Sequence, residues 1–128
     1  MKNLLIVAML FVNNMGMGQT VNSASIIGKP ITIDNLLVAQ NDFPYVMKWA
    51  EAKKACKALG RGWRLPNKDE LNVIYKNKAK LGVFWSEFYW SSSEVNSKEA
   101  WIQDFGPGDQ SFTTDKRNFS FVRAVNRF

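Results

Sequence analysis

The acidic side chains that could take part in catalysis lie in the second half of the sequence, at Glu87, Glu94, Asp104 and Asp109. A pair of carboxylates can hydrolyse a glycosidic bond, one acting as general acid and the other as base or nucleophile. Acids on polar loops are usually solvated, however, and a single domain of 128 residues seldom frames a deep cleft. A small glycan hydrolase that depends on Glu87 or Glu94 is therefore the least favoured of three functional hypotheses.

The residue inventory argues against most other catalysis. The sequence contains no histidine, which removes the usual general base, the serine and cysteine triads and the histidine-based metal sites. Its single cysteine, Cys56, cannot close a disulfide within the chain and falls on the apolar side of a predicted helix. We expect Cys56 to be a buried, inert thiol, and we predict neither an enzyme nor a bound cofactor.

Oxygen-bearing side chains that suit calcium are crowded into the same half, at Glu94, Asn96, Asp104, Asp109 and Asp115. Their spacing is not that of an EF-hand. Because Asp and Asn are also the residues that form turns, we predict turns here and no metal site.

The positive charge points to only a few kinds of partner. The net charge is +6, and lysines cluster on two predicted helices, at Lys53, Lys54, Lys57 and Arg61 and at Lys76, Lys78 and Lys80. Dispersed lysines of this kind usually form a solvated face. No nucleic-acid-binding module is visible, so we expect no nucleic acid, and anionic glycans or cell surfaces are the better electrostatic partners.

The first 18 residues have the layout of a secretory signal peptide. Lys2 precedes nine apolar residues from Leu4 to Val12, and Gly16 and Gly18 supply the small residues of a cleavage site. The apolar run is shorter than the roughly 20 residues of a membrane span. We predict cleavage after Gly18, with Ser25 as the alternative. A lead-in over residues 19–30 and one exported domain over residues 31–128 would follow, without a membrane-spanning segment.

The first half of the domain predicts a hairpin followed by a helix. Short strands over residues 31–33 and 36–39 flank Asp34 and Asn35, a plausible tight turn. The following helix ends at Gly60, because glycine enters the left-handed region without steric cost. Its apolar stripe is formed by Trp49, Ala52, Cys56 and Leu59.

A second helix and an aromatic sheet follow. Asn67 and Glu70 have the spacing of a capping box at the start of this helix, and Gly82 is its expected end. Its buried stripe is Leu71, Ile74 and Tyr75. From Phe84 onward, period-two alternation and aromatics predict antiparallel strands over residues 88–92, 100–105, 110–114 and 119–125, with Gly106 to Asp109 turning the middle pair.

The segment GWRLP connects the two helices and carries unusually bulky residues. Trp63 and Leu65 face one way and Arg64 the other if the segment is extended. We predict a short strand that enters the core, with Trp63 between the helices and the sheet and Pro66 preventing an early helix start. Glu94 is expected to pair with Arg123 or Arg64. The residues expected to serve structure are Trp63, Arg64, Asn67, Glu94, Trp101 and Arg123.

A set of short motifs carries a family resemblance. In order they are GWRLPNKDELNVIYKNK, YWSSSE, AWIQDF and the closing FVRAVNRF. Together, from Ile26 to Phe128, the chain resembles the Lcl C-terminal domain family, a domain of unknown function. The resemblance implies an α+β, C-type-lectin-like fold, with two helices packed on a twisted antiparallel sheet and a loop-rich C-terminal half. It also implies export, and kinship with bacterial adhesin tips and retroelement-diversified variable proteins.

Departures from related proteins limit what this resemblance implies. The Glu-Pro-Asn or Gln-Pro-Asp loop and the Trp-Asn-Asp strand that hold calcium in sugar-binding C-type lectins are missing. A single cysteine also lacks the pair that formylglycine-generating enzymes need. Neither calcium-dependent sugar binding nor oxidase chemistry is therefore expected.

Three functions remain for testing. The first is a non-enzymatic recognition or adhesion domain that binds a glycan or a protein through its C-terminal loops, where aromatic residues stand beside adaptable polar ones. The second is a structural cap of a fibre or envelope complex, and the third is the hydrolase. The oligomeric state is not set by the sequence. For the first function the predicted ligand-binding residues are Trp85, Asn96, Lys98, Asp109, Gln110, Thr113, Lys116 and Arg117.

Overall fold

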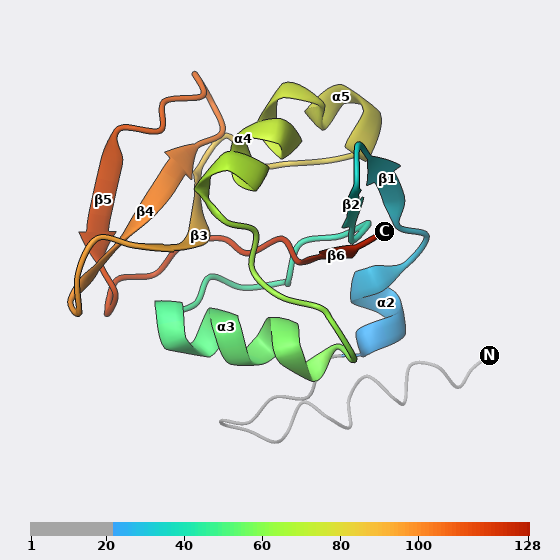
Figure 1. Cartoon of the computed structure of the whole chain (residues 1–128), viewed down its shortest axis with the longest axis horizontal. Coiled ribbons are helices and arrows are strands. Elements are labelled where there is room, and N and C mark those ends of the chain that lie inside the picture. The colour runs from blue at the N-terminus through green and yellow to red at the C-terminus, as the bar shows by residue number, and fades with distance from the viewer. Residues whose placement is uncertain (1–21) are drawn as a thin grey trace.

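Two small antiparallel sheets and two main helices make up the fold (Figure 1). The computed structural model describes residues 22–128, so the predicted signal peptide, residues 1–18, lies outside it. One sheet has the order β1-β2-β6 and the other β3-β4-β5. The strands are β1 (Ile31–Ile33), β2 (Leu36–Val38), β3 (Phe88–Glu94), β4 (Glu99–Asp104), β5 (Phe112–Asp115) and β6 (Val125–Arg127). The helices are α2 (Ser23–Ile27), α3 (Trp49–Ala58), α4 (Lys68–Lys76) and α5 (Lys78–Leu81).

The first hairpin forms as predicted, with its second strand one residue shorter. Ile33 stands opposite Leu36, and Asp34 takes the positive φ of 55° that a two-residue turn requires. β6 then pairs with β2, placing Val125 against Val38. The two ends of the described chain therefore meet in one sheet (Figure 1).

Helix α3 confirms the predicted apolar stripe. Trp49, Ala52 and Cys56 are buried, and Leu59 follows as the C-cap. The indole of Trp49 donates to the carbonyl of Ser91 over 2.9 Å, which fixes the start of the helix against β3. Gly60, at φ 137°, ends the helix where expected.

Helix α4 begins as predicted but ends early. The side chain of Asn67 accepts from the backbone N–H of Glu70 over 2.8 Å, and the Glu70 carboxylate accepts from the N–H of Asn67 over 2.9 Å. The continuous helix expected up to Gly82 is wrong, because Asn77 separates α4 from α5. Its side-chain amide donates to the carbonyl of Val73, as Asn side chains do at helix ends.

The aromatic half forms the predicted antiparallel strands, with one correction. β3, β4 and β5 match their predicted positions within about two residues, the usual uncertainty of element ends. The predicted strand over residues 119–125 is wrong, since only Val125–Arg127 is a strand. Ser120 and Phe121 make single bridges, to Met47 and Tyr89 respectively. This segment passes between the sheets and is joined to the loop after β2 by separate backbone hydrogen bonds, to the carbonyls of Ser120, Val122 and Ala124, that do not form a continuous ladder.

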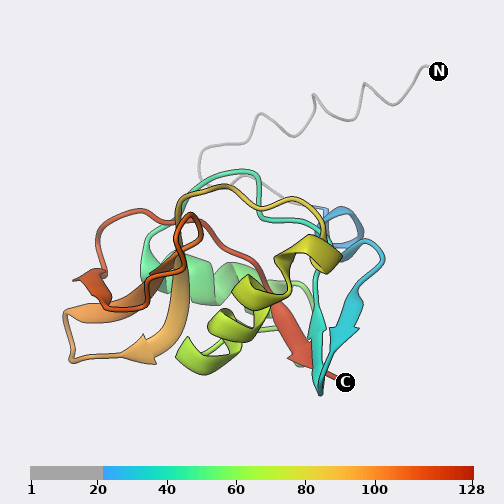
Figure 2. The ribbon, with the colours of Figure 1, turned by 90° about the horizontal axis from the view of Figure 1, so that it is seen from above.

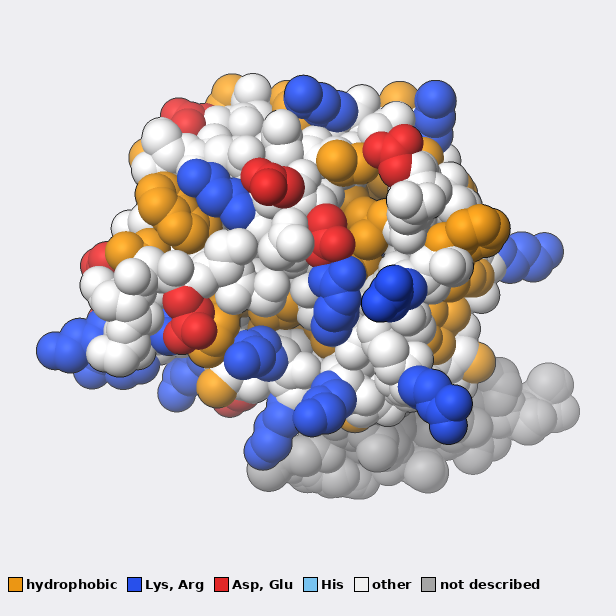
Figure 3. Space-filling model, viewed as in Figure 1, with side chains coloured by type: hydrophobic (Ala, Val, Ile, Leu, Met, Phe, Trp, Pro, Cys, Tyr) orange, Lys and Arg blue, Asp and Glu red, His pale blue; other side chains and the backbone are white. Residues whose placement is uncertain are grey.

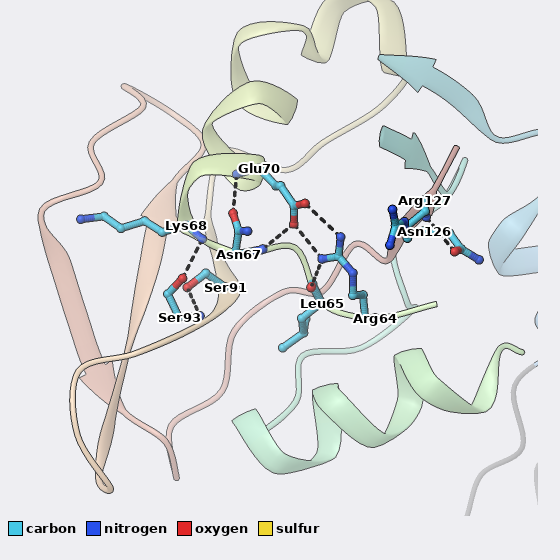
Figure 4. Close-up of polar contacts among 9 residues, drawn as sticks. All are labelled: Arg64, Leu65, Asn67, Lys68, Glu70, Ser91, Ser93, Asn126 and Arg127. Carbon is cyan, nitrogen blue, oxygen red and sulfur yellow. Dashed lines mark hydrogen bonds and ion pairs between the residues drawn. The ribbon is translucent and has the colours of Figure 1, made fainter. Parts of the chain in front are cut away.

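The GWRLP segment enters the core as predicted, but the predicted short strand is wrong, because the segment pairs only through a single bridge at Arg64. Trp63 and Leu65 belong to the main hydrophobic cluster, and Arg64 forms a two-way backbone pair with Val125 at 2.9 Å. The guanidinium of Arg64 turns outward and donates two hydrogen bonds, of 2.7 and 2.9 Å, to the carboxylate of Glu70 (Figure 4). Glu70 therefore both caps α4 and anchors the extended segment that precedes it.

A buried ion pair joins the C-terminal segment to the loop after β2. Arg123, 1% exposed, donates from Nε to Asp42 over 2.7 Å, and the hydroxyl of Tyr89 donates to the same carboxylate over 2.6 Å. The predicted pairing of Glu94 with Arg123 or Arg64 is wrong. β3 carries Glu94 toward the β3–β4 turn, where it binds the ammonium of Lys116 over 2.6 Å.

We expect Arg123→Met to lower the free energy of unfolding by about 3–5 kcal/mol, because Asp42 would be left buried and unpaired. Urea unfolding followed by circular dichroism measures this. Arg117→Met is the matched control, since Arg117 pairs with Asp115 while its side chain remains 86% exposed, and its unfolding midpoint should not move. Equal losses in both variants would contradict a special role for the buried pair.

The Arg64–Glu70 contact should make stability depend on pH. The hydrogen bonds from Arg64 lower the pKa of Glu70, so its contribution is complete above the ordinary glutamate pKa of about 4.3 and is lost as pH falls through the lower folded-state value. At pH 7, Glu70→Gln should cost about 1 kcal/mol, and the gap to the native protein should close in acid. Asp69→Asn is the control, because Asp69 makes no ion pair within residues 22–128. A gap that persists at pH 2, reached by acid titration of both proteins, would contradict this account.

Candidate ligand-binding face

Two long connections, β2 to α3 and α5 to β3, run alongside each other and position Trp85 (Figure 2). Arg123 joins them, donating to the carbonyl of Val83 over 2.6 Å and to that of Ala39 over 3.2 Å. The backbone N–H of Trp85 donates to the hydroxyl of Tyr89 over 3.0 Å. The loop that carries Trp85 is thus held by the buried network beneath it.

The indole of Trp85 is presented to solvent. Its side chain is 58% exposed, and its ring stacks on that of Phe121 with centroids 6.1 Å apart and an interplanar angle of 25°. One face of the ring is covered by this stacking. The remaining surface is available as a flat, pre-oriented contact for a ligand.

Two neighbouring hollows make this region concave. A hollow of about 440 Å³ lies beside Trp85, Pro44 and Val83. A second, of about 500 Å³, lies between Phe112 and Phe119, and both are bordered by Glu87 and Phe121. Phe119 is 58% exposed and Phe112 43% exposed. We call the surface formed by Trp85, Phe112, Phe119 and Phe121, with these two hollows, the aromatic face.

Both hollows of the aromatic face expose more apolar than polar surface, although polar side chains such as Asp42, Arg123 and Thr113 also line them. Glu87 stands between the hollows and makes no ion pair within residues 22–128. Asn118 and Thr114 border the second hollow and are hydrogen-bonded to each other over 2.7 Å. An apolar surface with a few fixed polar groups is the usual composition of a binding site.

Two of the predicted ligand-binding residues, Trp85 and Thr113, line these hollows. Four others gather around the β3–β4 turn and the end of β5. There Asn96 accepts from the N–H groups of Lys98 and Glu99, both over 2.8 Å, as a turn residue does. Lys98 and Arg117 are exposed beside a smaller hollow of about 320 Å³.

The side chain of Lys116 is largely buried and bound to other parts of the protein. Its ammonium donates to Glu94 and to the carbonyls of Asn96 and Ser97, and it lies 4.3 Å from the ring centroid of Trp49. These contacts occupy the donors that a ligand would need. Its position therefore favours a structural role.

Asp109 and Gln110 lie elsewhere, beside α4. Asp109 accepts from the backbone and hydroxyl of Ser111, which lowers the pKa of its carboxyl. The side-chain amide of Gln110 donates to the backbone carbonyl of Lys68 and to the side-chain oxygen of Gln103, so it points into the molecule. Trp101 was predicted to serve structure, and the ammonium of Lys68 lies over its ring, 3.7 Å from the ring centroid of Trp101. The predicted binding residues thus fall at three separate places.

Sequence reasoning missed Glu87, Phe112, Phe119 and Phe121 as parts of a surface. The sequence predicted a strand over residues 119–125 without fixing which of its faces is buried, and in the structure Ser120 is buried, at 5% exposure, while Phe119 faces solvent. The alternation with period two could be read from the sequence, but it is compatible with either face of the segment pointing outward. Which face is buried depends on the bridge that Ser120 makes to Met47.

Metal and nucleophile chemistry find little support in the described part of the chain. Within residues 22–128 no three His, Cys, Asp or Glu side chains gather closely enough to hold a metal ion. Cys56 is buried, and burial raises the pKa of its thiol to about 12, so the reactive thiolate is scarce at neutral pH. None of the helices within residues 22–128 is long and apolar enough to cross a membrane.

The fold matches that of known binding proteins. Botrocetin superposes with a TM-score of 0.57 at 10% sequence identity, over 79% of this chain and 98% of botrocetin, and a complex of botrocetin with a von Willebrand factor A1 domain gives the same values. EMS16, described as an antagonist of the collagen receptor integrin alpha2beta1, gives 0.54 at 13% identity, over 77% and 97% of the two chains. The chain therefore has a C-type-lectin-like fold.

The sequence also places the chain in a family. Residues 22–126 match the model of the Lcl C-terminal domain, so the protein belongs to the Lcl C-terminal domain family. No curated protein matches its sequence. Both the family and the fold agree with the resemblance found in the sequence motifs.

The exposure of Trp85 can be tested by fluorescence quenching. We expect Trp85→Phe to remove the largest share of the quenching by iodide, because Trp49, Trp63 and Trp90 are at most 8% exposed and Trp101 is only partly exposed beneath the ammonium of Lys68. Trp85→Ala should change the free energy of unfolding by less than about 1 kcal/mol, whereas Trp90→Ala, the buried control, should cost about 3–5 kcal/mol. Undiminished quenching in Trp85→Phe would show that another indole is the accessible one.

Proposed function

We propose that the protein is an exported, non-enzymatic recognition domain that binds a protein ligand through its aromatic face. The observation that carries the proposal is the exposure of Trp85, Phe112 and Phe119 around two adjoining hollows. Soluble proteins rarely expose contiguous apolar surface without a binding partner. Aromatic side chains are also the residues that dominate protein–protein binding energy.

Pre-organisation supports the same proposal. Trp85 is held by stacking on Phe121 and by the hydrogen bond from its backbone to Tyr89. Phe112 packs edge-on against Phe88, with ring centroids 5.4 Å apart. Side chains that are already ordered lose less conformational entropy on binding, so more of their contact energy appears as affinity.

Proteins of the same fold agree with a protein ligand. Botrocetin is seen in complex with a von Willebrand factor A1 domain, and EMS16 is an antagonist of a collagen receptor integrin. Identities of 10–13% carry the fold alone. The choice of a protein ligand therefore depends on the aromatic face of this chain.

The remaining parts of the proposal come from the sequence. The layout of residues 1–18 supports export, and the absence of histidine from all 128 residues supports a non-enzymatic role. The same aromatic surface would serve a structural cap of a fibre or envelope complex, if a neighbouring subunit covered it permanently. Self-association of the purified protein would favour that alternative.

A second candidate function is binding of an anionic glycan at Lys98 and Arg117. These side chains are exposed beside the hollow of about 320 Å³ at the β3–β4 turn. Arg117 remains 86% exposed although it is paired with Asp115. Binding there would weaken with salt, because exposed charges are screened.

The two candidates predict different losses on mutation. We expect the protein to bind one or more members of an array of purified extracellular proteins, and Trp85→Ser/Phe119→Ser to weaken that binding at least tenfold, or about 1.4 kcal/mol. Lys98→Ser/Arg117→Ser is the matched control and should bind as the native protein does. A parallel glycan array, at low and physiological salt, tests the second candidate.

Two results would overturn the first candidate. In the first, the protein binds no member of the protein array, and it binds a glycan in a salt-sensitive way that Lys98→Ser/Arg117→Ser removes. The other is protein binding that Trp85→Ser/Phe119→Ser leaves intact. Thermal unfolding of each variant ensures that a loss of binding is not a loss of fold.

A further inference from the structure

A second concave site lies beside α3, on a different part of the molecule. Its volume is about 440 Å³, and its lining includes Lys53 and Lys57 of α3 with Trp63, Leu65 and Ser92. We call it the α3 hollow. It shares no lining residue with the two hollows of the aromatic face. Its volume is within the range of small-molecule sites.

The floor of the α3 hollow is apolar and rigid. Trp63 and Leu65 are 8% and 2% exposed, and both belong to the main hydrophobic cluster. Gly62, also in the lining, has a φ of 85°, a conformation that glycine adopts without steric cost. Figure 4 shows Leu65 pointing toward α3, while the guanidinium of Arg64 reaches away to Glu70 on α4.

The rim of the α3 hollow is basic, and two of its cations lack a carboxylate partner. Arg64 gives both terminal nitrogens to Glu70. Lys53 and Lys57, one helical turn apart, make no ion pair within residues 22–128. Glu94 is close enough to Lys53 for that charge to lower its pKa, but Lys116 is its main partner. Lys and Arg side chains lie over the part of this face where Figure 1 places α3 (Figure 3).

We propose that the α3 hollow binds a small amphipathic anion, a carboxylate joined to an apolar ring or short chain. The apolar body would cover Trp63 and Leu65, and the carboxylate would lie between the ammonium groups of Lys53 and Lys57. A neutral apolar molecule would leave both charges unpaired, and an inorganic anion would not use the floor. Lysine suits this role because its flexible stem can bring a point charge to the ligand.

The arrangement of Lys53 supports a mobile rim. Its ammonium lies 4.4 Å from the ring centroid of Trp49, a contact worth about 0.5–1 kcal/mol at an exposed site. That contact is weak enough to be exchanged for a carboxylate without disturbing α3. Trp49 itself keeps its second cation, Lys116, and its hydrogen bond to Ser91.

The probe for this proposal is 4-phenylbutyrate, with 4-phenylbutanol and 4-phenylbutylamine as neutral and cationic controls of the same shape. In a nitrogen–proton NMR titration we expect saturable shifts of the Gly62 amide and the Trp63 indole, with a Kd on the order of 1 mM for a ligand of this size. The alcohol and the amine should bind at least about tenfold more weakly.

Variants assign the binding to the two lysines. Lys53→Gln/Lys57→Gln should weaken 4-phenylbutyrate binding at least about tenfold. Lys54→Gln/Lys80→Gln removes the same net charge at exposed positions that do not line the hollow, and it should bind normally. Matching thermal unfolding curves for the variants would show that both are folded.

Three outcomes would overturn the proposal. Equal binding of the acid and the alcohol would show that the lysines play no part. Equal losses in both double variants would show attraction by net charge alone. Absence of saturable shifts at Gly62 and Trp63 up to about 10 mM probe would show that the hollow holds no such ligand. The α3 hollow and the aromatic face share no lining residue. None of these results would therefore confirm or contradict the proposed function.

Discussion

The buried ion pair between Arg123 and Asp42 is the constraint on which the C-terminal half depends. A guanidinium that is 1% exposed cannot be left unpaired without a cost of several kcal/mol. Each of its three nitrogen atoms donates to an oxygen atom, Nε to Asp42 and the two terminal nitrogens to the carbonyls of Ala39 and Val83. Three connections that are distant in the sequence meet at one side chain.

The aromatic face takes its order from the same network. Tyr89 donates to Asp42 and accepts from the backbone of Trp85, and burial raises the pKa of its phenol, so it remains a neutral donor. The rings of Phe84 and Phe105 pack around Tyr89, and the guanidinium of Arg123 lies 3.9 Å from the Phe84 ring centroid. An exposed loop is thereby tied to fully buried groups. This coupling lets a solvent-facing tryptophan keep one orientation.

Local features of the fold could be predicted from the sequence, whereas long-range partners could not. The capping box of Asn67 and Glu70 depends on two residues three apart, so spacing alone identified it. The partner of Glu94 depends on which strand ends meet, and the sequence suggested Arg123 or Arg64 in place of Lys116. Trp85 was chosen for its residue type, but its neighbours on the aromatic face come from tertiary structure. Alternation in NFSF gave the period without the direction, which Ser120 decides by pairing with Met47.

Cationic side chains hold together the loops of this domain. The ammonium of Lys116 donates hydrogen bonds to the Glu94 carboxylate and to the backbone carbonyls of Asn96 and Ser97 at the β3–β4 turn. Arg123 donates hydrogen bonds to the two loops beside Trp85, and Arg64 connects its extended segment to the start of α4 through Glu70. In each case a fixed cation collects oxygen atoms from separate segments, and hydrogen bonds to charged groups are the stronger kind. Cations that are paired in this way let a chain with one cysteine keep long, irregular connections in a defined conformation. Within these connections Phe43 and Phe84 pack into the interior, and Trp85 can face solvent because hydrogen bonds from Arg123 and to Tyr89 already hold its loop.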